Sequence, residues 1–210
     1  MRYPVAETAE KHTRILSAAS ALFRKHGFAG VSVGKIMQAT GLTHGPFYNH
    51  FESKEALISE SLQDASEKAL AVMDAASGTP EDLLAYLHGY LSEEHRDAPG
   101  QGCLLAALAS EIAREQDVRS VLTRHVVATI DKLQGLFPWR VKKNARSQSI
   151  RTLSTMVGAL TLSRAVDDPK LSEEILREAR EMIEGSKSKV RQNVHKRVQR
   201  DLQSDGHCAV

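Results

Sequence analysis

The fold class follows most directly from residues 31–54, whose sequence is Val31-Ser-Val-Gly-Lys-Ile-Met-Gln-Ala-Thr-Gly-Leu-Thr-His-Gly-Pro-Phe-Tyr-Asn-His-Phe-Glu-Ser-Lys54. The segment holds two short helical patterns separated by Gly41, a residue that forms tight turns easily. The second pattern ends in aromatic and hydrogen-bonding side chains. This layout is typical of a helix-turn-helix, whose second helix can enter the major groove of DNA. We therefore expect a small DNA-binding head here.

The neighbouring sequence predicts the other helices of this head. Apolar residues recur at helical spacing before Gly27, at Ile15, Ala18, Ala19, Leu22 and Phe23. Ser32 and Thr43 are suitable N-caps for the second and third helices, and Pro46 is tolerated in a first helical turn. Phe47 and Phe51 are four residues apart, so we expect both in a small core with Leu22 and Phe23.

The remainder of the chain also has helical patterns and lacks the alternation typical of strands. Ser53 is expected to begin a fourth helix, and Thr79 followed by Pro80 to begin another. Further helices are predicted over 103–115, 117–137, 142–166 and about 172–185. We thus predict an all-α protein of about nine helices. It would have a three-helix head in residues 1–52, a body in 53–185 and a basic, disordered tail in 186–210.

The composition is that of a globular protein, with 41% hydrophobic and 26% charged residues among 210. Residues 1–60 carry seven Lys/Arg against five Asp/Glu, residues 61–185 fifteen against nineteen, and residues 186–210 six against two. A weakly basic head on an acidic body would orient the molecule toward a polyanion. No apolar run approaches the roughly 18 residues of a membrane span, and no secretory signal is visible. We expect a cytoplasmic protein with no membrane partner.

Three ordered strings resemble the TetR family of bacterial transcriptional regulators. They are Ile15-Leu-x-Ala-Ala-x-x-Leu-Phe23, Gly27-Phe-x-Gly-Val-Ser-Val33 and Ile36-Met-x-Ala-x-Gly-Leu-Thr-x-Gly-x-Phe-Tyr-x-His-Phe-x-Ser-Lys-Glu-Ala-Leu57. Beyond Leu57 the resemblance rests on length and helical architecture. It implies a homodimeric repressor on a near-palindromic double-stranded operator. It also implies that residues 53–185 bind a small organic effector and form the dimer, with no cofactor and no enzymatic activity.

The resemblance assigns DNA contacts to the helix-turn-helix. Thr43 would donate to a phosphate while it caps the third helix, and His44 and Gly45 would lie in the turn that faces base edges. Tyr48 could reach a phosphate, and Lys54 could neutralise the backbone. The full candidate set is Ser32, Lys35, Thr43, His44, Gly45, Pro46, Tyr48, Asn49, His50 and Lys54.

Apolar and aromatic residues of the body are candidates for the wall of an effector cavity, although ordinary core packing explains them equally well. They are Tyr86, Tyr90, Leu104, Phe137, Trp139 and Met156. Cys103 follows Gly-Gln-Gly at the predicted start of an apolar helix, where the helix dipole favours a thiolate. This start resembles family members that respond to electrophiles or oxidants, so a thiol-based sensor is an alternative function. A small buried thiol is the simpler interpretation.

Two apolar stripes in the last helices could pair with a second copy as a four-helix bundle, although an internal core would explain them too. The stripes are Leu153, Met156, Val157 and Leu160, and Ile175, Leu176, Ala179 and Ile183. We find no catalytic or phosphate-binding motif. His88 and His95, with Glu94, could share a helix face, but a solvated polar face explains them better than a metal site, and no metal is predicted. Two alternatives from other functional classes stay open: a helical protein-interaction adaptor and a helical enzyme with an unrecognised site.

Overall fold

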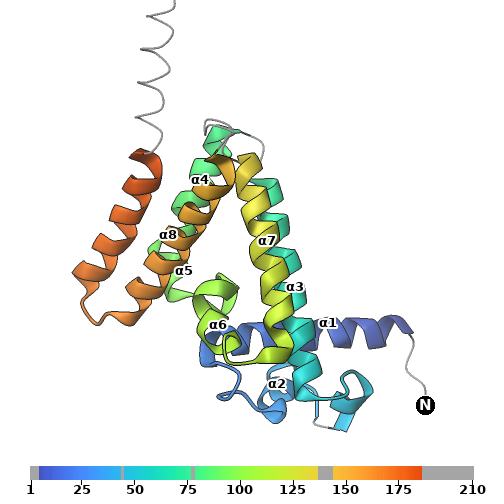
Figure 1. Ribbon diagram of the computed structural model, residues 1–210. Helices are drawn as coiled ribbons and strands as arrows, with labels where there is room; N and C mark the ends of the chain where they lie inside the picture. The colour runs from blue at the N-terminus through green and yellow to red at the C-terminus, as the bar shows by residue number, and fades with distance from the viewer. Residues whose placement is uncertain (1–4, 44, 77–78, 137–143, 186–210) are drawn as a thin grey trace, which may run out of the picture.

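The computed structural model describes residues 5–43, 45–76, 79–136 and 144–185 of the chain, and all regular structure within them is helical, as predicted (Figure 1). The head contains α1 (Val5–His26), α2 (Val33–Ala39) and the 3-10 helix η1 (Gly45–Asn49). The body contains α3 (Lys54–Ala75), α4 (Pro80–Tyr90), α5 (Glu93–Asp97), η2 (Pro99–Gln101), α6 (Leu104–Ile112), η3 (Gln116–Val118), α7 (Arg119–Leu136), α8 (Ala145–Ala165) and a final helix, residues 169–185. Within these ranges, no helix combines the length and the apolar character that crossing a membrane requires.

The turns of the head lie where the sequence predicted them. Gly27 ends α1 with φ 72° and Gly41 follows α2 with φ 70°, a conformation that glycine adopts without strain. A side chain at Gly27 would also collide with the carboxylate of Glu111. The hydroxyl of Ser32 caps α2 by accepting the amide hydrogen of Lys35 at 3.2 Å. The cap and the two turns are therefore determined by residues that are close to them in the sequence.

The third helix of the head is shorter and tighter than an α-helix. The amide groups of His50 and Phe51 both donate to the carbonyl of Phe47, at 2.9 and 3.0 Å, and end the helix. Ser53 then caps α3 at the amide of Ala56. Phe47 and Phe51 are 0% and 2% exposed, so the prediction that both face the core is confirmed.

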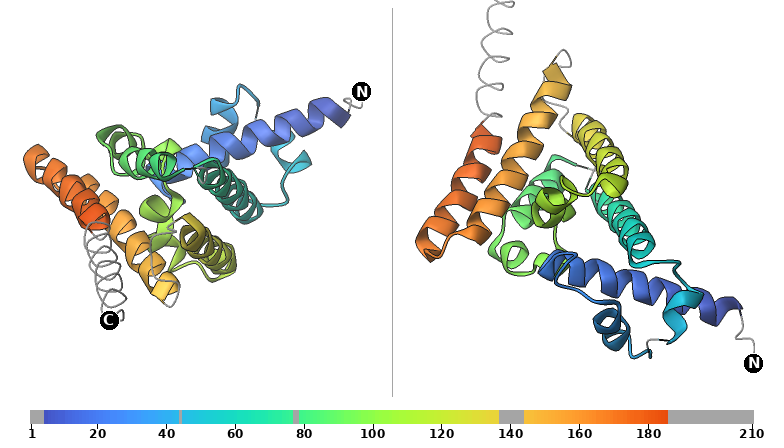
Figure 2. Two further views of the ribbon diagram at one scale, coloured as in Figure 1. Left: turned by 90° about the horizontal axis from the view of Figure 1, so that it is seen from above. Right: turned by 60° about the horizontal axis from the view of Figure 1, so that its bottom comes forward.

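The body is built on α3, which packs against α1 at one end and against α7 along its length. α8 and the final helix lie side by side on the part of the body remote from α2 and η1 (Figures 1 and 2). The final helix begins at 169, three residues before the predicted Ser172. Asp168 is the reason, because its Oδ1 accepts the amide hydrogen of Lys170 at 2.9 Å.

The two predicted dimer stripes lie mainly in the chain's own core. Met156, Leu160, Leu176 and Ile183 are at most 3% exposed. The internal-core alternative therefore holds for these residues. Different apolar side chains are exposed on the two helices, namely Ile150, Leu162, Leu171 and Met182. Predictions for Phe137, Trp139, His44 and the tail 186–210 fall outside the described residues.

Candidate functional site

Most of the predicted DNA-contacting residues are exposed on the head. Their exposed members are Ser32, Lys35, Thr43, Gly45, Tyr48 and Asn49, whereas His50 and Lys54 are half-buried. The side chain of Pro46 lies outside the described part of the structure, although its backbone belongs to η1. The head thus presents several hydrogen-bonding groups that a phosphate or a base edge could use.

Tyr48 projects outward because its neighbour is anchored in the core. Phe47 is fully buried, and the ring of Tyr48 meets it edge-on, with centroids 5.1 Å apart and an interplanar angle of 84°. Tyr48 itself is 66% exposed. A hydroxyl held outward by a buried aromatic neighbour is well placed to meet a nucleic-acid backbone.

Lys54 has a structural contact in the free protein. Its Nζ donates to the carbonyl of Phe28 at 2.6 Å, and the amide of Phe28 donates to Oε2 of Glu111 at 2.8 Å. The backbone of Phe28 therefore joins α3 and α6 to the end of α1. An ammonium has three donors, so this bond leaves others for a phosphate.

His50 is a candidate close to Lys54 in the sequence. Burial lowers the pKa of His50, and its electrostatic interactions with His12 and Lys11 lower it further, which favours the neutral imidazole. A neutral imidazole can still form a hydrogen bond to DNA, but it adds no charge to the head.

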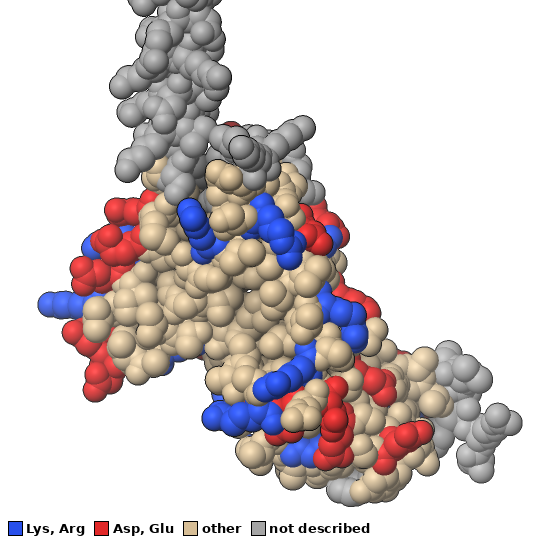
Figure 3. Space-filling view, viewed as in Figure 1, with Lys and Arg blue, Asp and Glu red and all other residues tan. Residues whose placement is uncertain are grey.

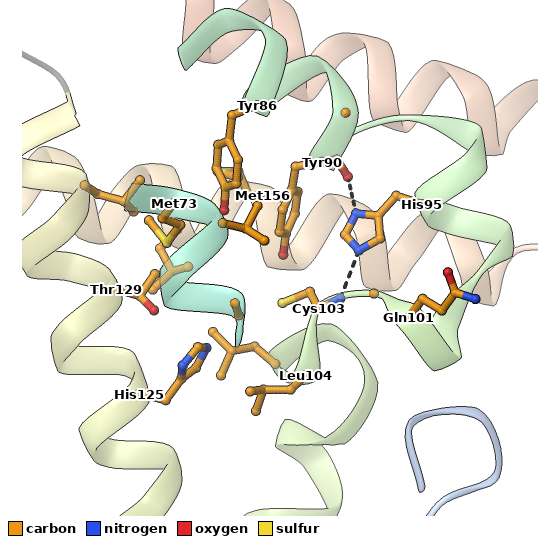
Figure 4. Close-up of a pocket in the computed structure, with 17 residues that line it drawn as sticks. Met73, Tyr86, Tyr90, His95, Gln101, Cys103, Leu104, His125, Thr129 and Met156 are labelled. Atoms are coloured by element: carbon orange, nitrogen blue, oxygen red, sulfur yellow. Dashed lines mark hydrogen bonds between the residues drawn. The ribbon is translucent and has the colours of Figure 1, made fainter. Parts of the chain in front are cut away.

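The body contains a partly open cavity of about 380 Å³, lined by residues of both apolar clusters of the core. Its wall is formed by α3, α4, the start of α5, residues 101–105, α7 and α8. Four of the six candidate effector residues, Tyr86, Tyr90, Leu104 and Met156, line it together with the candidate sensor residue Cys103 (Figure 4). A cavity of this volume is within the range of small-molecule sites.

Several polar wall residues were not identified from the sequence. His125 and Thr129 project from one face of α7 together with Leu133, and their spacing of four residues was the available signal. His125 pairs through Nδ1 with the hydroxyl of Ser66 at 2.8 Å. His95 comes from the five-residue helix α5 and Gln101 from the 3-10 helix η2, which are too short for periodicity to give guidance.

Among the described residues that line the cavity, none is Asp, Glu, Lys or Arg. Burial raises the pKa of Tyr86 and of Tyr90, so both phenols stay protonated at neutral pH. Burial lowers the pKa of His125 and of His95, which favours the neutral imidazoles. The cavity wall is therefore uncharged.

His95 fixes the start of α6 through both ring nitrogens. Nδ1 lies 2.7 Å from the carbonyl of Tyr90, which can only accept, so Nδ1 carries the proton. Nε2 then accepts the amide hydrogen of Cys103 at 2.9 Å (Figure 4). These bonds orient the imidazole and hold Cys103 at the cavity wall.

His88 and His95 lie on different helices, α4 and α5, and have different partners. His88 lies 2.5 Å from the carboxylate of Glu184 through Nε2. Within the part of the chain that the structure describes, no group of three His, Cys, Asp or Glu side chains could hold a metal ion.

Comparisons with known proteins agree on one family. Residues 15–60 match the profile described as bacterial regulatory proteins, tetR family. The chain is 29% identical over 175 residues to the HTH-type transcriptional regulator UidR of Escherichia coli K12, covering 82% of this chain and 88% of UidR. It is 32% identical over 101 residues to the HTH-type transcriptional repressor DhaR of Mycobacterium sp. strain GP1, covering 46% of this chain and 50% of DhaR.

A solved structure supports the same relationship. The TetR-family transcriptional regulator of Agrobacterium tumefaciens superposes with a TM-score of 0.70 at 26% identity, covering 83% of this chain and 98% of that protein. The similarity therefore extends from the head through most of the body.

Proposed function

Because the chain belongs to the TetR family of helix-turn-helix transcriptional regulators, we propose that it is a homodimeric repressor that a small organic molecule releases from its operator. The observation that carries this proposal is a continuous segment of the body that lines the cavity and also contacts the head. Residues 101–103 line the cavity, and the adjacent Gly100 contacts α1 of the head. The matched Mycobacterium relative is named a repressor, in line with this role.

Operator binding would use the exposed groups of α2 and η1. Tyr48 and Thr43 offer hydroxyls for phosphates, and Asn49 offers an amide that can pair with adenine. The charge of Lys35 adds a contact whose strength depends on salt. His44 and Pro46 remain candidates for the base-reading turn.

Release would follow from a shift between two arrangements of the head and body. A ligand in the cavity touches α3 at Ala69, Val72 and Met73, and α3 continues to the head. It also touches the segment that carries Gly100. A ligand that favours one position of these two elements changes the spacing of the two heads in a dimer, and hence operator affinity.

The outer faces of α8 and the final helix favour a second copy as partner. Leu162 and Met182 are each 56% exposed, and Gly158 on α8 has open space around it. In Figure 3 the centre of this side of the molecule is largely uncharged, and acidic side chains gather toward the final helix. An exposed apolar face bordered by charge is typical of a protein interface.

The experiment that tests the function is selection of bound duplexes from a random DNA pool with the full chain. Enrichment of a palindrome with half-sites about one helical turn apart supports a dimeric operator-binding protein. Absence of enrichment at several salt concentrations contradicts it. Reporter transcription from a promoter that contains the motif then separates repression from activation.

Cys103 favours a second candidate function, a thiol-based sensor of the same fold. Its side chain lines the cavity at the first residue before α6, where an electrophile that enters could react. Replacement of Cys103 by Ser distinguishes the two functions. If the variant keeps full release by oxidants or electrophiles, the thiol-sensor alternative is wrong.

A further inference from the structure

The proposed function leaves the chemical class of the effector open. The residues of the cavity wall limit which class of molecule can bind. Apolar side chains from four helices dominate the wall, including Met73, Leu104, Leu133 and Met156, which are at most 3% exposed to solvent. Such a wall favours a ligand that is mostly hydrocarbon. Val72, at the cavity and 59% exposed, marks where the wall reaches the surface.

Two hydroxyl groups on this wall are buried without an oxygen or nitrogen partner among the described residues. Oγ1 of Thr129 has no partner there, and Oη of Tyr90 interacts only with the thiol of Cys103, a weak hydrogen-bonding group. Thr129 is 5% exposed, so its hydroxyl has little contact with bulk solvent. Figure 4 shows Tyr90 extending from α4 toward Cys103 and Thr129 extending from α7 on the other side of the cavity. A buried hydroxyl without a partner is costly, and a ligand atom that pairs with it recovers that cost.

The guanidinium of Arg164 lies close to the wall but does not line the cavity. It donates to the carbonyls of His95 and Arg96 at 2.6 and 2.9 Å, and its Nη1 has no hydrogen-bond partner among the described residues. Because none of the described lining residues is charged, a carboxylate in the cavity would lose its water without a charged group of the wall to pair with, which is unfavourable.

We propose that the cavity takes an uncharged, mainly apolar molecule that carries a neutral oxygen function, such as a hydroxyl or carbonyl, bonded by Tyr90 or Thr129. A hydroxyl on the wall both donates and accepts, so alcohols, phenols, ketones and esters share the required chemistry. This inference rests on the proposed effector function and narrows its ligand class. The site that recognises the ligand is the pair of hydroxyls on opposite sides of the cavity.

The test uses three naphthalene compounds that differ in one substituent. The fluorescent probe N-phenyl-1-naphthylamine is bound to the full chain at pH 7.5 and displaced by 2-naphthol, naphthalene or 2-naphthoate. We expect 2-naphthol to bind about 3- to 10-fold more tightly than naphthalene, the range of one net hydrogen bond. We expect 2-naphthoate to bind at least about 10-fold more weakly than 2-naphthol, because its carboxylate would be desolvated. Tighter binding of 2-naphthoate would overturn the inference.

The variant Tyr90→Phe/Thr129→Val assigns the hydrogen bond. It should remove the advantage of 2-naphthol over naphthalene while naphthalene binding stays unchanged. Thr123→Val, on the exposed side of α7, is the matched control and should retain the advantage. An unchanged advantage in the double variant contradicts the assigned hydroxyls. Operator release is measured separately by fluorescence polarisation of a selected duplex. Binding of 2-naphthol without release would leave the ligand class standing and contradict the proposed function.

Discussion

The guanidinium of Arg24, on α1 of the head, donates from Nε and Nη2 to the carbonyl oxygen of Gly100 in the body, at 3.0 and 2.7 Å. Gly100 also approaches α1 so closely that a Cβ there would lie 3.1 Å from the carbonyl of Ala21. The next three residues line the cavity. The head is therefore joined to the cavity wall by a short backbone segment in addition to α3.

Replacing Arg24 with Met should weaken the communication between cavity and operator. The variant keeps the alkyl chain and loses both hydrogen bonds to Gly100. We expect operator affinity without ligand to change little, and the fold-reduction caused by a cavity ligand such as 2-naphthol to shrink about 3- to 10-fold. Fluorescence polarisation of labelled operator with and without the ligand measures this quantity. Arg114→Met, an exposed arginine, is the control. Equal release by the Arg24 variant and the wild type would show that the contact between Arg24 and Gly100 does not carry the coupling.

Replacing Thr129 with Val should stabilise the protein in the absence of ligand. The change keeps the shape and removes a buried hydroxyl that lacks a partner among the described residues. We expect the free energy of unfolding to rise by about 1 kcal/mol. Urea denaturation measures it, with Thr123→Val expected within about 0.5 kcal/mol of the wild type. A clear loss of stability in Thr129→Val would indicate that the hydroxyl already has a partner.

The sequence predicted the head better than the cavity for a physical reason. Caps and turns such as Ser32, Gly41 and Ser53 are local, since their backbone role depends on residues three or four positions away. The cavity joins Val72, Tyr90 and Thr129 from three helices, and their meeting depends on packing over long sequence separations. The aromatic members could be proposed from residue type, whereas Thr129 could not.

The dimer stripes illustrate the same limit. Helical spacing identifies one apolar face of α8 correctly, but it does not say whether that face meets the same chain or a second copy. Met156 and Leu160 lie in the chain's own core, and Leu162 is exposed on the same helix. Only the packing of α8 in the folded chain distinguishes a face that meets the chain's own core from a face that is open to a second copy.

Stability should decrease as the pH falls below about 6.5. Burial lowers the pKa of His95 and of His125 from 6.5, so in this range the unfolded chain binds protons that the folded chain does not. Their contribution is complete above pH 6.5 and is lost as the pH falls toward the folded-state pKa. Protonating His95 at Nε2 would also remove the acceptor for the amide of Cys103.

Urea denaturation at pH 7.5 and 5.5 checks this pH dependence. His95→Gln and His125→Gln should each reduce the difference in unfolding free energy between the two values, whatever their effect at pH 7.5. His26→Gln, a substitution of the same kind at an exposed position, is the matched control. A difference that neither buried variant reduces would assign the pH dependence to other groups.

Replacing Leu162 with Glu should dissociate the proposed dimer. The substitution places a charge on the exposed apolar face of α8, and we expect the dimer dissociation constant to rise by about 30-fold or more. Light scattering coupled to size-exclusion chromatography measures the mass over a range of concentrations. Val127→Glu is the matched control, because Val127 is 42% exposed on a different helix, α7. Identical masses for the two variants would place the interface elsewhere.

Replacing Tyr48 with Phe should weaken operator binding without changing its sequence preference. The hydroxyl is proposed to meet a phosphate, and such contacts position the protein without reading bases. We expect affinity to fall about 10-fold across operators of different sequence, the scale of a hydrogen bond to a charged group. The thermal midpoint should not change, because the buried Phe47 holds η1 in place. Asn49→Ala provides the contrast: if the amide reads a base, its loss relaxes specificity at one position of each half-site, by about 1–3 kcal/mol. A Tyr48→Phe variant that changes the selected motif would instead assign the hydroxyl to a base edge, and one with unchanged affinity would remove it from the interface.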